Sequence, residues 1–208
     1  MAQQTSPVDT TPRRETILTV AAQLFSRRGF AATTMRDIAD ATGLLAGSLY
    51  HHFESKDAIA DAILSRSLEG LLDRYRAAQR ETTDPASQLA GLVRASFAAM
   101  ADDPDAALIY LRDRELFLQI PRFAYLEATR AQVDDIWLGV LRTGQRRGAF
   151  RSDVDAQTFY RYASTALWWS AGWQRVDAAA SEGAADAFLS IFRQAITALP
   201  AAKVRSKR

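Results

Sequence analysis

The 208-residue chain has no cysteine, only two histidines, and no apolar run approaching the roughly 20 residues of a membrane-spanning helix. Without cysteine, neither disulfides nor thiolate zinc sites can form, and a reducing compartment is the simplest interpretation. Residues 1–10 lack the basic start and apolar centre of a signal peptide. These absences predict a cytoplasmic protein that does not cross a membrane.

Groups for catalysis or metal binding are also scarce. Both histidines, His51 and His52, belong to one short segment. His51 and Glu54 form one histidine–carboxylate pair at metal-ligand spacing, but a di-metal site in a helix bundle needs a second such pair. Asp102–Asp103 and Asp134–Asp135 are adjacent pairs that face different ways, as is typical of helix caps and exposed surface. The sequence therefore predicts no enzyme, no metal site and no cofactor.

The net charge of +2 is unevenly distributed. Residues 1–56 carry +1 and the last six residues carry +4, which leaves −3 for the middle of the chain. Because a short basic tail is typical of a solvated chain end, the overall positive charge is no evidence for DNA binding.

Apolar residues recur at helical spacing along most of the chain and predict an all-α fold of about nine helices. No convincing strand pattern or internal repeat is present. Gly183 is expected in the loop before the last helix, which Pro200 ends. After a flexible leader (1–11), capping residues, prolines and glycines place the first eight helices at about 12–28, 34–42, 45–52, 56–80, 85–100, 104–118, 121–144 and 155–176. The ninth helix follows the Gly183 loop and includes Phe188 to Leu199.

The segment from Thr33 to Lys56 reads TTMRDIADATGLLAGSLYHHFESK and contains two short helix patterns separated at Gly43. Two short helices joined by a tight glycine-containing turn form a helix-turn-helix, whose second helix can enter the DNA major groove. This segment therefore predicts DNA binding.

A longer segment, AAQLFSRRGFAATTMRDIADATGLLAGSLYHHFESK, closely resembles the DNA-binding domain of the tetracycline-repressor (TetR) family. The match is ungapped and covers about the first quarter of the chain. It implies a DNA-binding domain at 12–56 and a ligand-binding and dimerisation domain at 57–200, followed by a basic tail at 201–208. It also implies a homodimeric repressor that binds a palindromic operator in double-stranded DNA and is released by a small-molecule effector.

The second helix of the motif begins with small residues, which allow a close approach of its backbone to the groove. Thr33 and Thr34 are either phosphate contacts or simple N-caps, and Arg36 either reaches a guanine edge or pairs with Asp40. Tyr50 is expected to contact a phosphate unless it only packs in the core. The predicted DNA-binding residues are Thr33, Thr34, Arg36, Ala46, Gly47, Ser48, Tyr50, His51, His52 and Lys56.

Large aromatic residues are concentrated in the C-terminal half, where they either fill the core or line an apolar cavity. RDRELFLQIPRFAYLEATR and FYRYASTALWWSAGW look similar to actinobacterial TetR-family regulators of lipid and steroid breakdown, whose effectors include acyl-CoA thioesters. That similarity implies an apolar or acyl-CoA-like effector. The predicted ligand-binding residues are Phe117, Phe123, Tyr125, Trp137, Tyr160, Ser164 and Trp168.

The last two helices are the expected dimer interface, because the FYRYASTALWWSAGW helix is apolar nearly all round. The predicted interface residues are Trp169, Trp173, Phe188, Ile191, Phe192 and Ile196.

Two questions stay open from the sequence. Arg112, Arg114, Arg122 and Arg130 either meet an anionic ligand group or form surface ion pairs with the acidic residues between them. The alternative function is a DNA-binding regulator with no small-molecule effector, switched by a protein partner, or an activator. A filled core around Trp168 would favour that alternative, and an open cavity would favour the ligand-responsive regulator.

Overall fold

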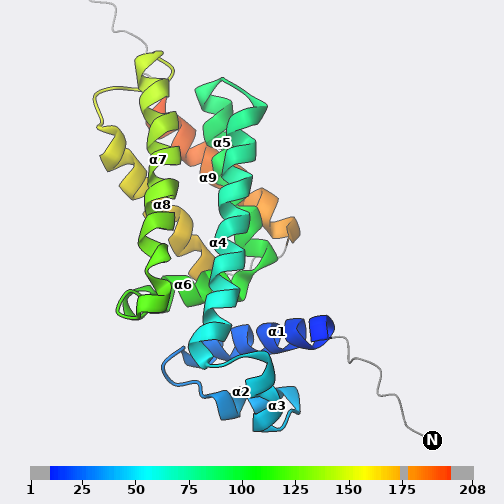
Figure 1. Ribbon diagram of the computed structural model, residues 1–208. Coiled ribbons are helices and arrows are strands. Elements are labelled where there is room, and N and C mark those ends of the chain that lie inside the picture. The colour runs from blue at the N-terminus through cyan, green and yellow to red at the C-terminus, as the bar shows by residue number, and fades with distance from the viewer. Residues whose placement is uncertain (1–9, 174–177, 198–208) are drawn as a thin grey trace, which may run out of the picture. The chain divides into compact units, whose positions relative to one another are not determined.

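The computed structural model describes residues 10–173 and 178–197 (Figure 1), so the leader and the basic tail lie almost wholly outside it. The predicted all-α fold is confirmed for these residues. Apart from one short 3-10 helix, η1 (Pro121–Phe123), the elements are α1 (Thr10–Arg28), α2 (Met35–Thr42), α3 (Ala46–His52), α4 (Lys56–Glu81), α5 (Pro85–Asp102), α6 (Pro104–Phe117), α7 (Tyr125–Arg146), α8 (Ala156–Trp173) and α9 (Ala178–Ile196). Within the described part of the chain, no helix is both long and apolar enough to cross a membrane.

The chain forms two compact units, each with its own core. The first unit holds residues 10–69 and 103–128, and the second holds the remaining described residues. The sequence placed a domain boundary at residue 56, but the N-terminal part of α4 and the whole of α6 pack with α1, α2 and α3. Ile59 and Ile63 of α4 and Ile109 of α6 are fully buried in that shared core.

The core of the first unit is built from aliphatic residues of α1–α4 and a chain of aromatic rings. Phe30 lies 4.8 Å from Phe117 between ring centroids, and Phe117 lies 4.6 Å from Phe123. Phe25 also packs on Phe30, with ring centroids 5.3 Å apart. These rings join the turn after α1 to the end of α6 and to η1.

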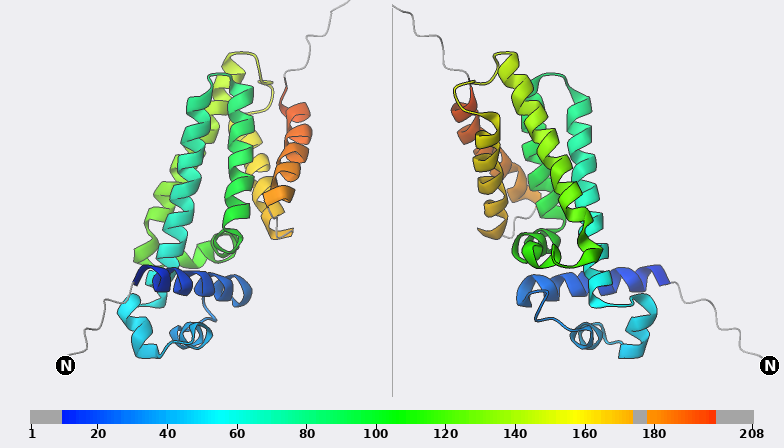
Figure 2. Two further views of the ribbon diagram at one scale, coloured as in Figure 1. Left: turned by 90° about the vertical axis from the view of Figure 1, so that its right-hand side faces the viewer. Right: turned by 60° about the vertical axis from the view of Figure 1, so that its left-hand side comes forward.

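The second unit packs α5 against α9, which lie side by side in both figures (Figures 1 and 2). Tyr75 of α4 is fully buried there, and its hydroxyl lies 2.6 Å from that of Ser96 on α5. Burial raises the pKa of Tyr75 to about 12, so the phenol stays neutral at physiological pH. Trp137 of α7 packs edge-on against Tyr75, with ring centroids 6.1 Å apart.

Two helix boundaries differ from the sequence prediction. Gly183 was expected in a loop but lies inside α9, which already begins at Ala178. The surrounding sequence AAASEGAADA is rich in alanine, and this strong helix propensity outweighs the roughly 1 kcal/mol cost of one glycine. Pro121 begins the short η1 and not the long helix, since α7 begins at Tyr125.

Candidate nucleic-acid interface and effector cavity

Helix α2 begins with a complete capping box. The Thr34 hydroxyl accepts a hydrogen bond from the Asp37 N–H at 3.1 Å, and the Asp37 carboxylate accepts one from the Thr34 N–H at 2.8 Å. The Thr34 hydroxyl also donates to the Asp37 carboxylate at 2.5 Å, and this bond, together with the one from the Thr34 N–H, holds the pKa of Asp37 below its usual value. The helix ends at Gly43, whose positive φ of 67° suits a residue without a side chain. The capping role of Thr34 is therefore present, and its phosphate contact stays a prediction.

Thr33 is placed differently from the expectation. Its side chain is fully buried, and its hydroxyl donates to the Gly29 carbonyl at 2.8 Å. A buried hydroxyl that fastens the turn between α1 and α2 cannot present itself to a phosphate, so the structure removes Thr33 from the DNA-facing set.

One face of helix α3 is buried and the opposite face is exposed to solvent. Leu49 and the following Phe53 are buried in the core. Ala46, Gly47, Tyr50 and His51 are exposed, whereas Ser48 and His52 are half-buried. On α2, the Arg36 side chain is 88% exposed and lies 3.9 Å from Asp40, a loose pair that leaves its guanidinium accessible. The predicted base and phosphate contacts of these residues stay predictions.

Lys56 has a structural contact in addition to its predicted role. Its ammonium donates to the Phe30 carbonyl at 2.8 Å and lies 4.3 Å from the centroid of the Phe30 ring. This cation ties the start of α4 to the turn after α1. The half-buried Lys56 ammonium keeps two further N–H groups, so its phosphate contact stays a prediction.

Arg14 is a residue that the sequence analysis missed. Its guanidinium carbon lies 4.6 Å from the Phe53 ring centroid, and the side chain is exposed. This contact places a cation of α1 beside the C-terminal end of α3, next to the half-buried His52. The only sequence signal was the pair Arg13–Arg14 in the opening turns of the first helix.

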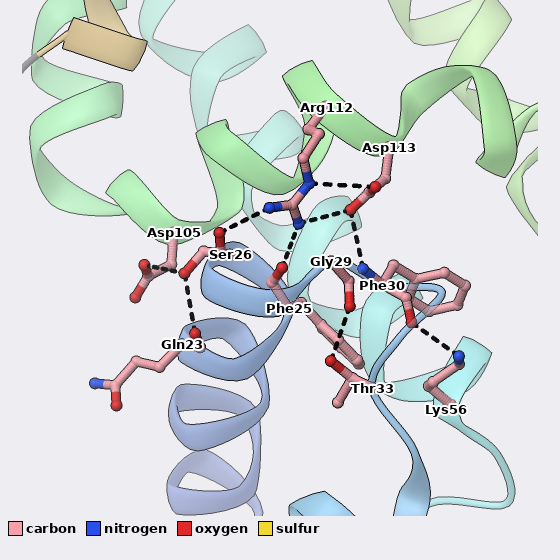
Figure 3. A network of polar contacts seen from close by, with 10 residues as sticks. All are labelled: Gln23, Phe25, Ser26, Gly29, Phe30, Thr33, Lys56, Asp105, Arg112 and Asp113. Atoms are coloured by element: carbon pink, nitrogen blue, oxygen red, sulfur yellow. Dashed lines mark hydrogen bonds and ion pairs between the residues drawn. The ribbon is translucent and has the colours of Figure 1, made fainter.

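A polar network fastens α6 to the end of α1 (Figure 3). The Arg112 guanidinium donates to the Ser26 carbonyl at 2.9 Å and also to the Phe25 carbonyl. Its neighbour Asp113 accepts the Phe30 N–H at 3.1 Å, and Asp105 accepts the Ser26 hydroxyl at 2.6 Å. Helix α6 thus supplies a donor for the Ser26 carbonyl and carboxylate acceptors for the Ser26 hydroxyl and the Phe30 N–H.

The second unit contains a cavity of about 410 Å³ among α5, α7, α8 and α9. The ring of Phe150 reaches this cavity because Gly144 has no Cβ, which would lie 2.0 Å from that ring. Arg193 also borders the cavity and forms no ion pair with any described residue. The apolar lining is made by Leu89, Val93, Trp137, Phe150, Phe159, Ala163, Phe188, Leu189, Phe192 and Ile196.

Of the predicted ligand-binding residues, only Trp137 borders this cavity. Phe117 and Phe123 are fully buried in the core of the first unit, and Tyr125 packs on that same core. This placement corrects the prediction for these three residues, because their aromatic rings close the core that supports the helix-turn-helix.

The other three predicted ligand-binding residues lie on α8 but outside the cavity lining. Tyr160 is buried, packs on Trp137 and donates to Asp134 at 2.8 Å. Burial and this hydrogen bond raise the pKa of Tyr160. Ser164 donates to the Arg161 carbonyl of its own helix, and Trp168 is half-buried. Phe159 and Ala163 form the α8 wall instead.

The predicted dimer-interface residues separate into two groups. Trp169 of α8 and Ile191 of α9 are 65% and 68% exposed, as an uncovered interface requires. Phe188, Phe192 and Ile196 instead line the cavity, where the rings of Phe188 and Phe192 stack at 4.0 Å. The side chain of Trp173 lies outside the described part of the structure. Tyr162, 70% exposed on α8, is a further bare aromatic residue that the prediction missed.

The four arginines left open by the sequence are all paired with carboxylates. Arg112 contacts Asp113, Arg114 contacts Glu115 and Glu127, Arg122 contacts Glu54 and Asp61, and Arg130 contacts Asp134. The ion-pair alternative therefore accounts for them.

Two family models match the chain. The model described as bacterial regulatory proteins, tetR family, matches residues 17–63, and the model described as tetracyclin repressor-like, C-terminal domain, matches residues 82–200. Among curated proteins, the chain is 39% identical over 163 residues to the HTH-type transcriptional repressor KstR2 of Rhodococcus jostii, covering 78% of this chain and 80% of that protein. It is 40% identical over 163 residues to KstR2 of Mycobacterium tuberculosis, covering 78% and 82%.

Solved structures agree with these matches. The ketosteroid transcriptional regulator KstR2 of Mycobacterium tuberculosis superposes with a TM-score of 0.86 at 36% identity, over 95% of this chain and 98% of that one. AibR, solved with isovaleryl coenzyme A and operator DNA, shares the fold at a TM-score of 0.75 and 21% identity, over 86% of this chain and 97% of that one. The curated relatives are transcriptional regulators. The chain therefore belongs to the TetR family of bacterial regulatory proteins.

Proposed function

We propose that this protein is a homodimeric transcriptional repressor that binds a palindromic operator in the cytoplasm and leaves it when an apolar or acyl-CoA-like effector binds. The observation that carries the proposal is the combination of two features in one chain. One unit presents the bare face of α3 on a helix-turn-helix, and the other contains a large cavity with an aromatic lining.

The DNA-binding part of the proposal rests on the exposed residues of α2 and α3. Arg36 can form two hydrogen bonds to a guanine, Tyr50 can donate to a phosphate, and the small residues Ala46 and Gly47 permit close approach. One such unit contacts only a few base pairs. A dimer that binds two half-sites about one helical turn apart, or a multiple of it, explains how tight and specific binding is reached.

The effector part rests on the cavity chemistry. Its aromatic and aliphatic lining suits a hydrophobic ring system or acyl group, and a volume of about 410 Å³ is within the usual range for small-molecule sites. Arg193, which has no ion-pair partner among the described residues, suits a carboxylate or phosphate on the same ligand. The similarity to the ketosteroid transcriptional regulator KstR2 of Mycobacterium tuberculosis supports a steroid-derived ligand.

The test is selection of operators from a random double-stranded DNA pool with the full-length protein. We expect an inverted repeat to be enriched, and we expect light scattering to give the mass of two chains. Enrichment of no sequence, or of a single asymmetric half-site bound by a monomer, would contradict the proposal.

A further inference from the structure

Leu45 lies immediately before α3 and is 83% exposed, more than any other large apolar residue in the described part of the chain. Its neighbour Leu44 packs against the core of the first unit. The two adjacent leucines therefore have opposite surroundings, and the core of the first unit gains nothing from the apolar side chain at position 45.

Helix capping gives no reason for a leucine here either. Leu45 is the N-cap of α3, a position where serine, threonine, aspartate or asparagine is favoured, and it makes no side-chain capping bond. The same unit caps α2 with Thr34, which forms a full capping box. At α3 only the backbone is engaged, since the Leu45 carbonyl accepts from the N–H groups of Ser48 and Leu49 at 2.9 and 3.2 Å.

The surroundings of Leu45 suit contact with a base edge. The next residues, Ala46 and Gly47, are small and exposed, and nothing lies within 4 Å of a Cβ built on Gly47. The N-terminal residues of a recognition helix are the ones that contact base edges. In the major groove, the methyl group that a base pair offers is the C5-methyl of thymine.

We propose that Leu45 is a specificity-determining residue that contacts the methyl group of one thymine in each operator half-site. This inference rests on the proposed function, because it requires α3 to lie in the major groove of an operator. It explains why a position that favours a capping hydroxyl holds a solvent-exposed leucine: the contact requires an apolar side chain.

The test replaces thymine by deoxyuridine, one position at a time, in the operator selected by the wild-type protein. Uracil lacks the methyl group and keeps the hydrogen-bonding atoms. Because uracil removes one buried methyl group, we expect about fourfold weaker binding when the substitution falls at one particular position of each half-site. The Leu45→Ser variant should bind the thymine and uracil operators equally well at that position, whereas Leu45→Met, which keeps an apolar side chain, should retain the discrimination.

Thermal unfolding separates base contact from a structural role. Serine supplies the missing N-cap, so Leu45→Ser should unfold about 2–4 °C higher than wild type while losing its discrimination. A lower Tm, or discrimination that persists in Leu45→Ser, would contradict the proposal, as would a wild-type protein indifferent to uracil at every position. Failure of the proposed function is distinguishable, because the wild-type protein would then enrich no inverted repeat in the first place.

Discussion

The two units use their polar and aromatic side chains differently. In the first unit, polar groups from α4 and α6 hold the backbone around the end of α1, and aromatic rings such as Phe117 and Phe123 close the core. In the second unit, the aromatic rings border a cavity, and Trp169, Tyr162 and Ile191 are left bare.

This difference matches two separate demands on one chain. A surface that recognises DNA has to be held in one arrangement, because base contacts tolerate little displacement. A unit that senses a ligand needs space for it and an arrangement that the ligand can bias. Substitutions in one unit should therefore leave the task of the other unit intact.

The largest effect is expected from the bare apolar residues of the second unit. The double variant Trp169→Glu/Ile191→Glu should be monomeric, because four carboxylates would be placed at one two-fold interface. Because a monomer contacts only one half-site at a time, its operator binding should be about 100-fold weaker or more, as measured by fluorescence anisotropy. Light scattering would give the mass of the variant. The matched control Leu111→Glu/Leu116→Glu changes two exposed apolar residues of α6 and should remain dimeric. A dimeric Trp169→Glu/Ile191→Glu variant would move the interface elsewhere.

Filling the cavity should remove ligand sensing and leave DNA binding intact. Ala163 is buried in the α8 wall, and Ala163→Phe would occupy part of the space. A ligand at 100 times its Kd stabilises the wild-type protein by about 2.7 kcal/mol, and this gain should vanish in a thermal-shift assay. Ala131→Phe, which changes an exposed position on α7 outside the cavity lining, should keep it. Equal ligand response in both variants would place the effector site outside this cavity.

Arg36→Ala should relax the preference at one base pair of each half-site. A bidentate arginine–guanine contact provides about 1–3 kcal/mol of discrimination between bases. The operators selected by Arg36→Ala should therefore vary at that base pair and keep the wild-type base preference at all other positions. Tyr50→Phe, which removes only a hydroxyl, should instead weaken binding to all sequences about equally. If Arg36→Ala selects the same operators as wild type, Arg36 is only the surface partner of Asp40.

The smallest effect is expected in the polar network of Figure 3. Arg112→Ala removes donors from the last carbonyls of α1, and because Arg112 is partly exposed the cost should be about 1 kcal/mol in urea unfolding. Arg94→Ala, which removes a single exposed ion pair to Asp186 in the second unit, should cost less. Equal costs would mean that α6 is not fastened to α1 through Arg112.

Local signals explain what the sequence predicted well. The Thr34–Asp37 capping box and the turn at Gly43 are set by residues a few positions apart, so the helix-turn-helix could be placed before any tertiary structure was known. The bare face of α3 follows from the spacing of Leu49 and Phe53.

The cavity could not be predicted in the same way. Helix α8 is apolar nearly all round, so periodicity does not tell which face borders a cavity, and Phe159 and Ala163 were overlooked in favour of Ser164 and Trp168. The role of Phe117 depends on contact with Phe30, 87 positions earlier in the chain, and no local pattern records that pairing.

The most direct test of the account is a titration of the operator-bound dimer with a panel of acyl-CoA thioesters and steroid carboxylates. Operator affinity and tryptophan fluorescence are followed together, and Trp137→Phe assigns the signal to the cavity. The account predicts that at least one compound quenches the fluorescence and raises the operator Kd at least tenfold, which corresponds to about 1.4 kcal/mol of coupling. A panel that changes neither signal would contradict ligand-controlled DNA binding.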